Sequence, residues 1–278
     1  MRGCLFLLLL PCVAHALEPL PDSALAKVSG RDGMSFNLSN FAMSGNAVLR
    51  YYTPDNRGSI GIGNLSASRS DNADAPFADP YRLDVISGGP GRADIVNIAM
   101  PQNLLGREAW QIALDFDVQD GGITVQGGSV MVKDLVYYGG GIQWSTPIAG
   151  DGLAFGISTR MEIGSLALQP NGRADGNEAL VLSNVRIGAA TGDGSAPTAA
   201  WRIADVTSQA GIFNARTDEA GNSRLHIGIN WPEAGAAAAA GTLQIGNISF
   251  RSDAGNVDLG SSRIGSIQLQ YLDVKFRP

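Results

Sequence analysis

The chain has 278 residues, of which 44% are hydrophobic and 17% charged, and its formal net charge at pH 7 is −6. This mild, scattered acidity gives no reason to expect nucleic-acid binding, which requires clustered basic residues. The 36 glycines and the sparse charges are typical of strand-and-turn proteins. A chain of this length can bury roughly three quarters of its unfolded surface.

The first sixteen residues are typical of a secretory signal peptide. Arg2 provides a basic start, Leu5 to Leu10 an apolar run, and Ala14-His15-Ala16 a small-x-small cleavage site. The apolar run is far too short to span a bilayer, and no later segment approaches a transmembrane helix. Both cysteines, Cys4 and Cys12, lie inside this signal. We therefore expect an exported mature chain without disulfides or a thiolate nucleophile.

One short helix with its turn is predicted directly after the signal, over residues 17–33. Its features are a cap at Asp22 or Ser23, an apolar face with Leu25 and Val28, and a C-terminal stop at Gly30. Such a helix is too short to be stable alone and must pack on something.

The same segment resembles a known family. The residues are Leu20-x-Asp22-x-x-Leu25-x-x-Val28-x-Gly30-x-Asp32-Gly33-Met34. This pattern is similar to the N-terminus of a family of exported β-rich proteins of Gram-negative bacteria, some of which are described as components of Fil-type pilus systems. The resemblance covers residues 20–34, with a looser likeness in later Ile-Gly strands. It implies export and surface assembly, and it transfers no catalytic residue.

The rest of the chain is predicted to consist of strands, because short apolar alternations are separated by Gly-, Asn- and Asp-rich turns. The predicted strands are residues 34–38, 47–52, 59–67, 81–87, 95–100, 110–118, 122–135, 143–146, 153–168, 179–187, 200–206, 211–217, 223–231, 242–251 and 263–276.

Four copies of one motif, built around an Ile-Gly pair, organise these strands. In the best copies apolar residues fall at positions −2, 0, +3 and +5 relative to the isoleucine. The step of three across the glycine breaks the period of two, so a regular strand would turn its second half outward. An extra residue at this step, as a bulge or as a corner between two sheets, would return every apolar side chain to one buried interior. The copies are IGIGNLSA at residues 60–67, MEIGSLAL at 161–168, LQIGNISF at 243–250 and SRIGSIQL at 262–269.

The copies have no fixed spacing, which favours an irregular β domain over a regular parallel β-helix. We therefore predict an all-β fold over residues 34–278: a single, elongated, irregular β-sandwich or a β-roll-like stack of mostly antiparallel strands. The best candidate for a linker is the alanine tract at residues 234–241.

Few residues suggest chemistry. Three Asx-rich turns, at residues 71–74, 175–178 and 253–258, offer oxygen ligands of the kind Ca²⁺ prefers. Their spacing matches no known calcium loop, and such turns form without metal. His226, the one histidine outside the signal, is predicted to face the less buried side of its strand. We therefore expect no catalytic residues, no cofactor and no metal site.

Aromatic residues leave a second function open. Trp110, Trp144, Trp201 and Trp231, with the pairs Tyr51-Tyr52 and Tyr137-Tyr138, could stack on sugars. In each pair one ring should point inward and the other outward.

The features together favour an exported, non-enzymatic structural or adhesive surface protein, a candidate component of a pilus or filament system that assembles through β-strand edges. Residues 36–38 and 264–276 are the predicted edges, and the expected partners are other protein chains. A secreted glycan-binding module is the first alternative. A secreted hydrolase is the second, since any β scaffold could bring two carboxylates together.

Overall fold

The computed structural model describes residues 33–53, 55–74, 79–104, 106–217, 219, 221, 223–230, 240–269 and 271–275. They all belong to one unit, Gly33–Pro278. The predicted signal peptide, the predicted N-terminal helix and residues 234–239 of the alanine tract lie outside the described residues. None of the described residues belongs to a helix that is long and apolar enough to cross a membrane.

The described part of the chain is all-β, as predicted, and each of its strand pairs is antiparallel. The strands are β1 Met34–Phe36, β2 Ala42–Ser44, β3 Val48–Tyr52, β4 Gly58–Arg69, β5 Tyr81–Ile86, β6 Ile95–Ala99, β7 Trp110–Asp120, β8 Ile123–Ser145, β9 Leu153–Gln169, β10 Ala179–Ala189, β11 Trp201–Ala204, β12 Gly211–Thr217, β13 Ser223–Asn230, β14 Gly241–Ser252, β15 Gly255–Ile267 and β16 Tyr271–Lys275.

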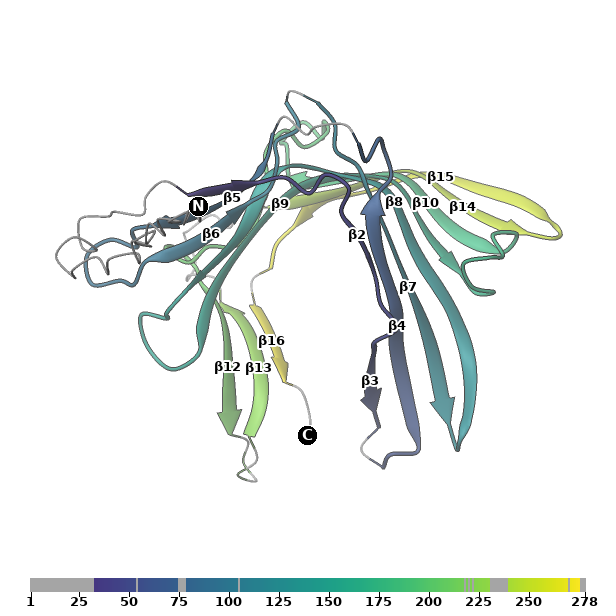
Figure 1. Ribbon diagram of the computed structural model, residues 1–278, viewed down its shortest axis with the longest axis horizontal. Helices are drawn as coiled ribbons and strands as arrows, with labels where there is room; N and C mark the ends of the chain where they lie inside the picture. The colour runs from purple at the N-terminus through teal and green to yellow at the C-terminus, as the bar shows by residue number, and fades with distance from the viewer. Residues whose placement is uncertain are drawn as a thin grey trace, which may run out of the picture. The chain divides into compact units, whose positions relative to one another are not determined.

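These strands form one sheet that branches at its two longest members, β8 and β9 (Figure 1). The first part of β8 pairs with β7, and its last part pairs with β6. On its other edge, β9 pairs in succession with β12, β11 and β10. One branch runs through β4, β7, β8, β9, β10, β14 and β15, and the other contains β1, β5, β6, β12, β13 and β16.

A line of irregular residues crosses the first branch from strand to strand. Asp134 in β8 and Asn184 in β10 have positive φ values of 55° and 52°. The register places Asp134 across from Gly164 in β9, and Asn184 between Gly164 and Gly246 in β14. We call this row the kink line.

The kink line restores the phase that the Ile-Gly motif breaks. Ile163 and Leu166, three positions apart in β9, pack against the same central cluster of Trp110, Leu135, Ile163 and Val185. In β4, two residues oppose one of β7 between Gly63 and Ser66, which is a bulge at the predicted step. An extra residue at the predicted step is therefore present in β4, and in β14 and β15 where they pair with each other, whereas β9 pairs through Gly164 without one.

The prediction of one buried interior is wrong for half of the motif copies. Ile163 is buried and Ile245 packs against the central cluster, but Ile62 and Ile264 are exposed. Residues paired across an antiparallel ladder share a face, and Ile264 pairs with Leu243 of the clustered face. The isoleucines therefore lie on one face of the sheet. That face is buried at Ile163 in the centre of this branch and exposed at Ile62 and Ile264 toward its margins.

Strand boundaries differ from the prediction at three places. Residues 122–135 and 143–146 belong to one strand, β8, because a bulge between Tyr137 and Gly140 lets the glycines continue it. The predicted strand 263–276 is divided between β15 and β16, which pair with β14 and β13 respectively. The strand β2 and the first part of β15 were not predicted, and Gly241 of the predicted linker begins β14.

Candidate assembly surface

Both predicted edges contain strands that are paired on one side within the described part of the chain. β1, which includes Phe36 of the predicted edge 36–38, pairs with β5 alone. The other predicted edge, 264–276, falls on β15, paired with β14 alone, and on β16, paired with β13 alone. β3, at the opposite margin of the first branch from β15, pairs with β4 alone.

β15 is the longest of these edge strands. Its 13 residues are exposed at every position except Ile267, which is half-buried. Val257, Leu259 and Ile264 are large apolar side chains in this strand, and Leu259 is 62% exposed. The strand contains only two charged residues, Asp258 and Arg263. A long apolar edge with few charges is the type of strand that pairs with another chain.

An apolar face extends from this edge to β3. The residues Leu168, Leu180, Phe250 and Val257 form a cross-strand row. This row lies on the same face as Leu166 and Leu182, which pack against the central cluster two positions further along their strands. At the other margin, Tyr51, Ile60, Val118 and Val125 form a similar row. We call the exposed part of this surface the outer apolar face; it contains Leu49, Tyr51, Ile60, Ile62, Leu65, Val118, Val125, Leu168, Phe250 and Val257. Large exposed apolar patches mark interaction surfaces.

The opposite face of the same strands contains polar groups as well as the exposed side chains of Val48 and Tyr52. Arg50 of β3 forms an ion pair with Asp117 of β7, with Nη1 2.8 Å from Oδ1. The pair crosses Gly61 of β4, where a Cβ would lie 2.6 Å from Arg50 Nη2. A larger residue at position 61 would require the ends of the Arg50 and Asp117 side chains to shift.

Asp115 lies at the centre of a second polar group on this face. Its Oδ1 accepts hydrogen bonds from Ser129 Oγ at 2.7 Å and Arg173 Nε at 2.6 Å, and its Oδ2 accepts one from Asn64 Nδ2 at 3.0 Å. Burial alone would raise the pKa of Asp115, but these hydrogen bonds outweigh it and the pKa is lowered. The group anchors the turn that contains Arg173 to β4 and β7.

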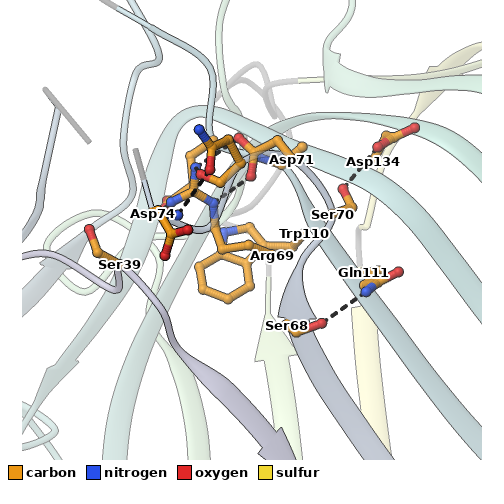
Figure 2. Close-up of polar contacts among 12 residues, drawn as sticks. Ser39, Ser68, Arg69, Ser70, Asp71, Asp74, Trp110, Gln111 and Asp134 are labelled. Carbon is orange, nitrogen blue, oxygen red and sulfur yellow. Dashed lines mark hydrogen bonds and ion pairs between the residues drawn. The ribbon is translucent and has the colours of Figure 1, made fainter. Parts of the chain in front are cut away.

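A buried charged cluster, which the sequence did not suggest, lies at the C-terminal end of β4, around Arg69 and Asp71 (Figure 2). Arg69 donates from Nε and Nη2 to Asp71, at 2.5 and 2.8 Å, and Asp71 Oδ2 also accepts the Ala109 N–H. Arg69 Nη1 lies 3.6 Å from Glu108 Oε1. We call these residues, with Tyr81 and Trp110, the Arg69 cluster.

Glu108 is the most constrained member of the Arg69 cluster. It is 1% exposed, and neither carboxylate oxygen accepts a hydrogen bond of ordinary geometry. Burial raises the pKa of Glu108, although the Tyr81 hydroxyl, the Arg69 charge and the Trp110 N–H oppose that rise. Trp110 Nε1 donates to the Tyr81 hydroxyl at 3.1 Å, and Phe36 stacks on Tyr81. Arg69 pairs with Asp71 and lies beside Glu108 within the fold, so we assign this cluster a structural role.

The Asx-rich turns use their oxygens internally. Asp71 binds Arg69, and Asn72 Oδ1 accepts the Asp74 N–H. Asn171 Nδ2 lies 3.3 Å from both Asp175 Oδ2 and Glu178 Oε2. The third predicted turn, 253–258, is the hairpin between β14 and β15, and its last residues belong to β15. In the described residues no group of three or more His, Cys, Asp and Glu side chains could hold a metal ion.

His226 does not face the less buried side, and that prediction is wrong. It is 3% exposed, and its Nδ1 lies 2.7 Å from Asn214 Oδ1 in β12. β13 has β12 on one edge and β16 on the other, so His226 lies between Asn214 and residue 275 of the neighbouring strands. His226 is therefore a structural residue between strands.

Three of the tryptophans that could have stacked on sugars lie in the core of the fold. Trp110 and Trp201 are buried, and Trp144 packs against the core cluster around Phe155. Trp231 lies outside the described residues. Tyr51 and Tyr52 are both exposed, so the expected inward ring is absent at that pair. The cause is that β3 is an edge strand whose two faces are both exposed there.

An apolar cavity lies in the second branch, beside the core cluster of Ile95, Ala154 and Val206. Its volume is about 200 Å³, and its lining is mainly small and aliphatic. Its polar groups are few: Arg92 Nη1, near the rim, already donates to the Thr207 carbonyl at 2.6 Å. No aromatic ring lines it, so it does not resemble a sugar site.

Comparisons with protein-family models, with curated proteins and with solved structures found no match to this chain.

Proposed function

We propose that this chain is an exported structural or adhesive protein without enzymatic activity that assembles at a cell surface, as part of a pilus or filament system, by pairing β-strand edges. The observation that carries the proposal is β15: thirteen residues, paired on one side within the described chain, and exposed almost throughout. The predicted signal peptide and the N-terminal resemblance point to the same compartment.

The physical basis is main-chain hydrogen bonding. An unpaired edge presents N–H and C=O groups at regular intervals, so an added strand satisfies a whole row of them at once. Alternate side chains then provide selectivity. In β15, Val257 and Ile264 lie on the apolar face, whereas Asp258 and Arg263 lie on the polar face, opposite Ser249 and Gln244 respectively.

The proposal is tested in the bacterium that produces the chain. The double variant Val257→Lys/Leu259→Lys places charges on the exposed edge, which opposes strand addition. We expect the variant to be exported in normal amount and to be lost from sheared surface filaments, as judged by electron microscopy and by the surface fraction.

The matched control places the same charge elsewhere. Leu104 and Ile148 are exposed apolar residues outside every described strand. The variant Leu104→Lys/Ile148→Lys should assemble normally. Normal filaments from the β15 variant would refute the proposed role of this edge, and loss with both variants would indicate a general effect of charge.

The two alternatives are addressed with the same purified protein. A selective hit on a glycan array would favour a glycan-binding module. Turnover of a panel of glycosides and esters would favour a hydrolase. Neither result is expected from a protein whose role is assembly.

A further inference from the structure

We infer that β15 pairs with β15 of a second copy of this chain, antiparallel and about a two-fold axis between Gly260 and Ser261. This inference rests on the proposed function and names the partner of the edge. In this register residue i lies opposite residue 521 − i of the second copy, a sum fixed by the numbers 260 and 261. Three independent properties of β15 agree with it.

The first property is charge. Asp258 and Arg263 are the two charged residues of β15, and neither forms an ion pair with the described residues. The register places Asp258 opposite Arg263 of the second copy, and by symmetry the reverse. Asp258 Oδ1 accepts a hydrogen bond from Asn247, and the Arg263 guanidinium lies beside Gly194, so a change of rotamer brings it to the edge. Opposite charges across a ladder are stabilising, and like charges are destabilising.

The second property is the face of each apolar residue. Val257 pairs with Phe250 and Ile264 pairs with Leu243, both on the apolar face of β14. In a regular strand two residues seven apart lie on opposite faces. The bulge at Leu259 and Gly260 removes that difference, so Val257 lies beside Ile264 of the second copy on one continuous apolar face. A two-fold axis perpendicular to the sheet preserves this continuity.

The third property is the direction of the backbone groups. The Gly255 carbonyl accepts the Ser252 hydroxyl, and the Ile264 carbonyl accepts the Thr242 hydroxyl, so both carbonyls point toward β14. Because main-chain groups alternate in direction along a strand, those of Asp258 and Arg263 point toward the free edge. The two residues that form the charge pair are thus also able to exchange main-chain hydrogen bonds.

The position of the axis also continues a feature of the sheet. Neighbouring strands of this branch place their irregular residues side by side, as Asp134, Gly164, Asn184 and Gly246 do. Gly260, with φ of 79°, is the irregular residue in the middle of β15, and it pairs with Ile248, two positions from Gly246. A register centred on or beside Gly260 brings the irregular residues of both copies together, and the axis between Gly260 and Ser261 is the one among these that also pairs Asp258 with Arg263. A register centred on Asp258 would instead place two aspartates opposite each other.

Disulfide trapping tests the register. The full chain with Cys4→Ser and Cys12→Ser contains no other cysteine. In the double variant Val257→Cys/Ile264→Cys, each new cysteine faces its complement in the second copy across a non-hydrogen-bonded pair, where Cα atoms lie about 4.5 Å apart. We expect a covalent dimer under mild oxidation. The single variants and Val257→Cys/Ser262→Cys, which is out of register, should stay uncrosslinked.

Charge exchange tests the ion pair. Asp258→Arg or Arg263→Asp alone creates two like-charge pairs per dimer and should weaken dimerisation about tenfold, as measured by sedimentation. The exchange variant Asp258→Arg/Arg263→Asp should restore it. Both side chains are exposed, so none of these variants should change the free energy of unfolding measured at concentrations where the chain is monomeric.

The outcomes are distinct. A monomer at every concentration, a crosslink only in the out-of-register variant, or failure of the exchange variant to restore the dimer would each overturn the inference. A crosslink between Leu49→Cys and Ile264→Cys would also overturn it, in favour of head-to-tail pairing of β3 with β15. These measurements use purified protein without filaments. Their failure can therefore be separated from failure of the proposed surface function.

Discussion

Asp134 and Gly164 lie opposite each other across β8 and β9, and a Cβ on Gly164 would stand 2.8 Å from the Asp134 Cβ. Asn184 and Gly246 repeat this relationship across β10 and β14, with 2.9 Å between the corresponding atoms. The glycine of the Ile-Gly motif thus makes room for an Asp or Asn whose left-handed backbone turns its side chain toward it. The motif therefore needs a complement on the neighbouring strand, namely an Asp or Asn with left-handed backbone opposite the glycine.

Replacing this glycine should destabilise the sheet. In Gly164→Ala the new methyl group meets Asp134 Cβ, which the backbone holds in place, so β8 and β9 must separate. We expect a loss of about 1–3 kcal/mol in the free energy of unfolding, measured with urea.

Gly265→Ala is the matched control at the same motif position. There the nearest atoms belong to the Arg263 side chain, at 3.5 Å or more. Its expected effect is small, and equal losses in the two variants would contradict the steric explanation.

The complement can be tested separately at Asn184. Its φ of 52° is costly for residues without a short polar side chain, by about 1–2 kcal/mol. Asn184→Ala should therefore lower the free energy of unfolding by about 1 kcal/mol, whereas Asn184→Gly should not. If both substitutions were equally destabilising, contacts of the amide group would explain the position better than the backbone conformation.

The spacing of the motif was sufficient to predict the irregularity but not its cause. The spacing of three residues between Ile163 and Leu166 indicates a break in the period of two within β9. Asp134 belongs to a different strand whose local sequence contains no glycine at that point, so the pairing becomes visible only with the register. A local sequence pattern reports on its own strand only. The strand that pairs with it is known only from the tertiary structure.

The same limit explains the errors at His226 and β15. Alternation placed His226 opposite its apolar neighbours, but its burial depends on Asn214 of β12 and on the position of β16. Residues 253–258 are rich in Asx and Gly, which favoured a turn. Only Asp253 and Ala254 form it, because the strand resumes at Gly255 with exposed residues that no apolar alternation reveals.

The Arg69 cluster predicts an unusual pH dependence. Burial raises the pKa of Glu108 in the folded chain above its unfolded value. The stabilising contribution of this group is then complete below its unfolded pKa, about 4.3, and is lost as the pH rises through the folded pKa. Glu108→Gln does not ionise, so its free energy of unfolding should increase relative to the unsubstituted chain between pH 4 and pH 7.

Urea unfolding of both proteins across this pH range measures the difference. Glu219→Gln, at an exposed turn, controls for the loss of one negative charge. Parallel pH curves for Glu108→Gln and the unsubstituted chain would show that the Glu108 carboxyl is not destabilised by burial.

The last prediction compares two isoleucines that occupy the same motif position. Ile163 is 8% exposed within the central cluster, and Ile62 is 45% exposed on the outer apolar face. Because the cost of truncation follows the area buried and the cavity left, Ile163→Ala should lower the free energy of unfolding by about 2–5 kcal/mol. Ile62→Ala should cost less than about 1 kcal/mol in the same urea titration. Comparable losses would mean that the outer apolar face is covered in the isolated chain, and would remove the basis for treating it as an interaction surface.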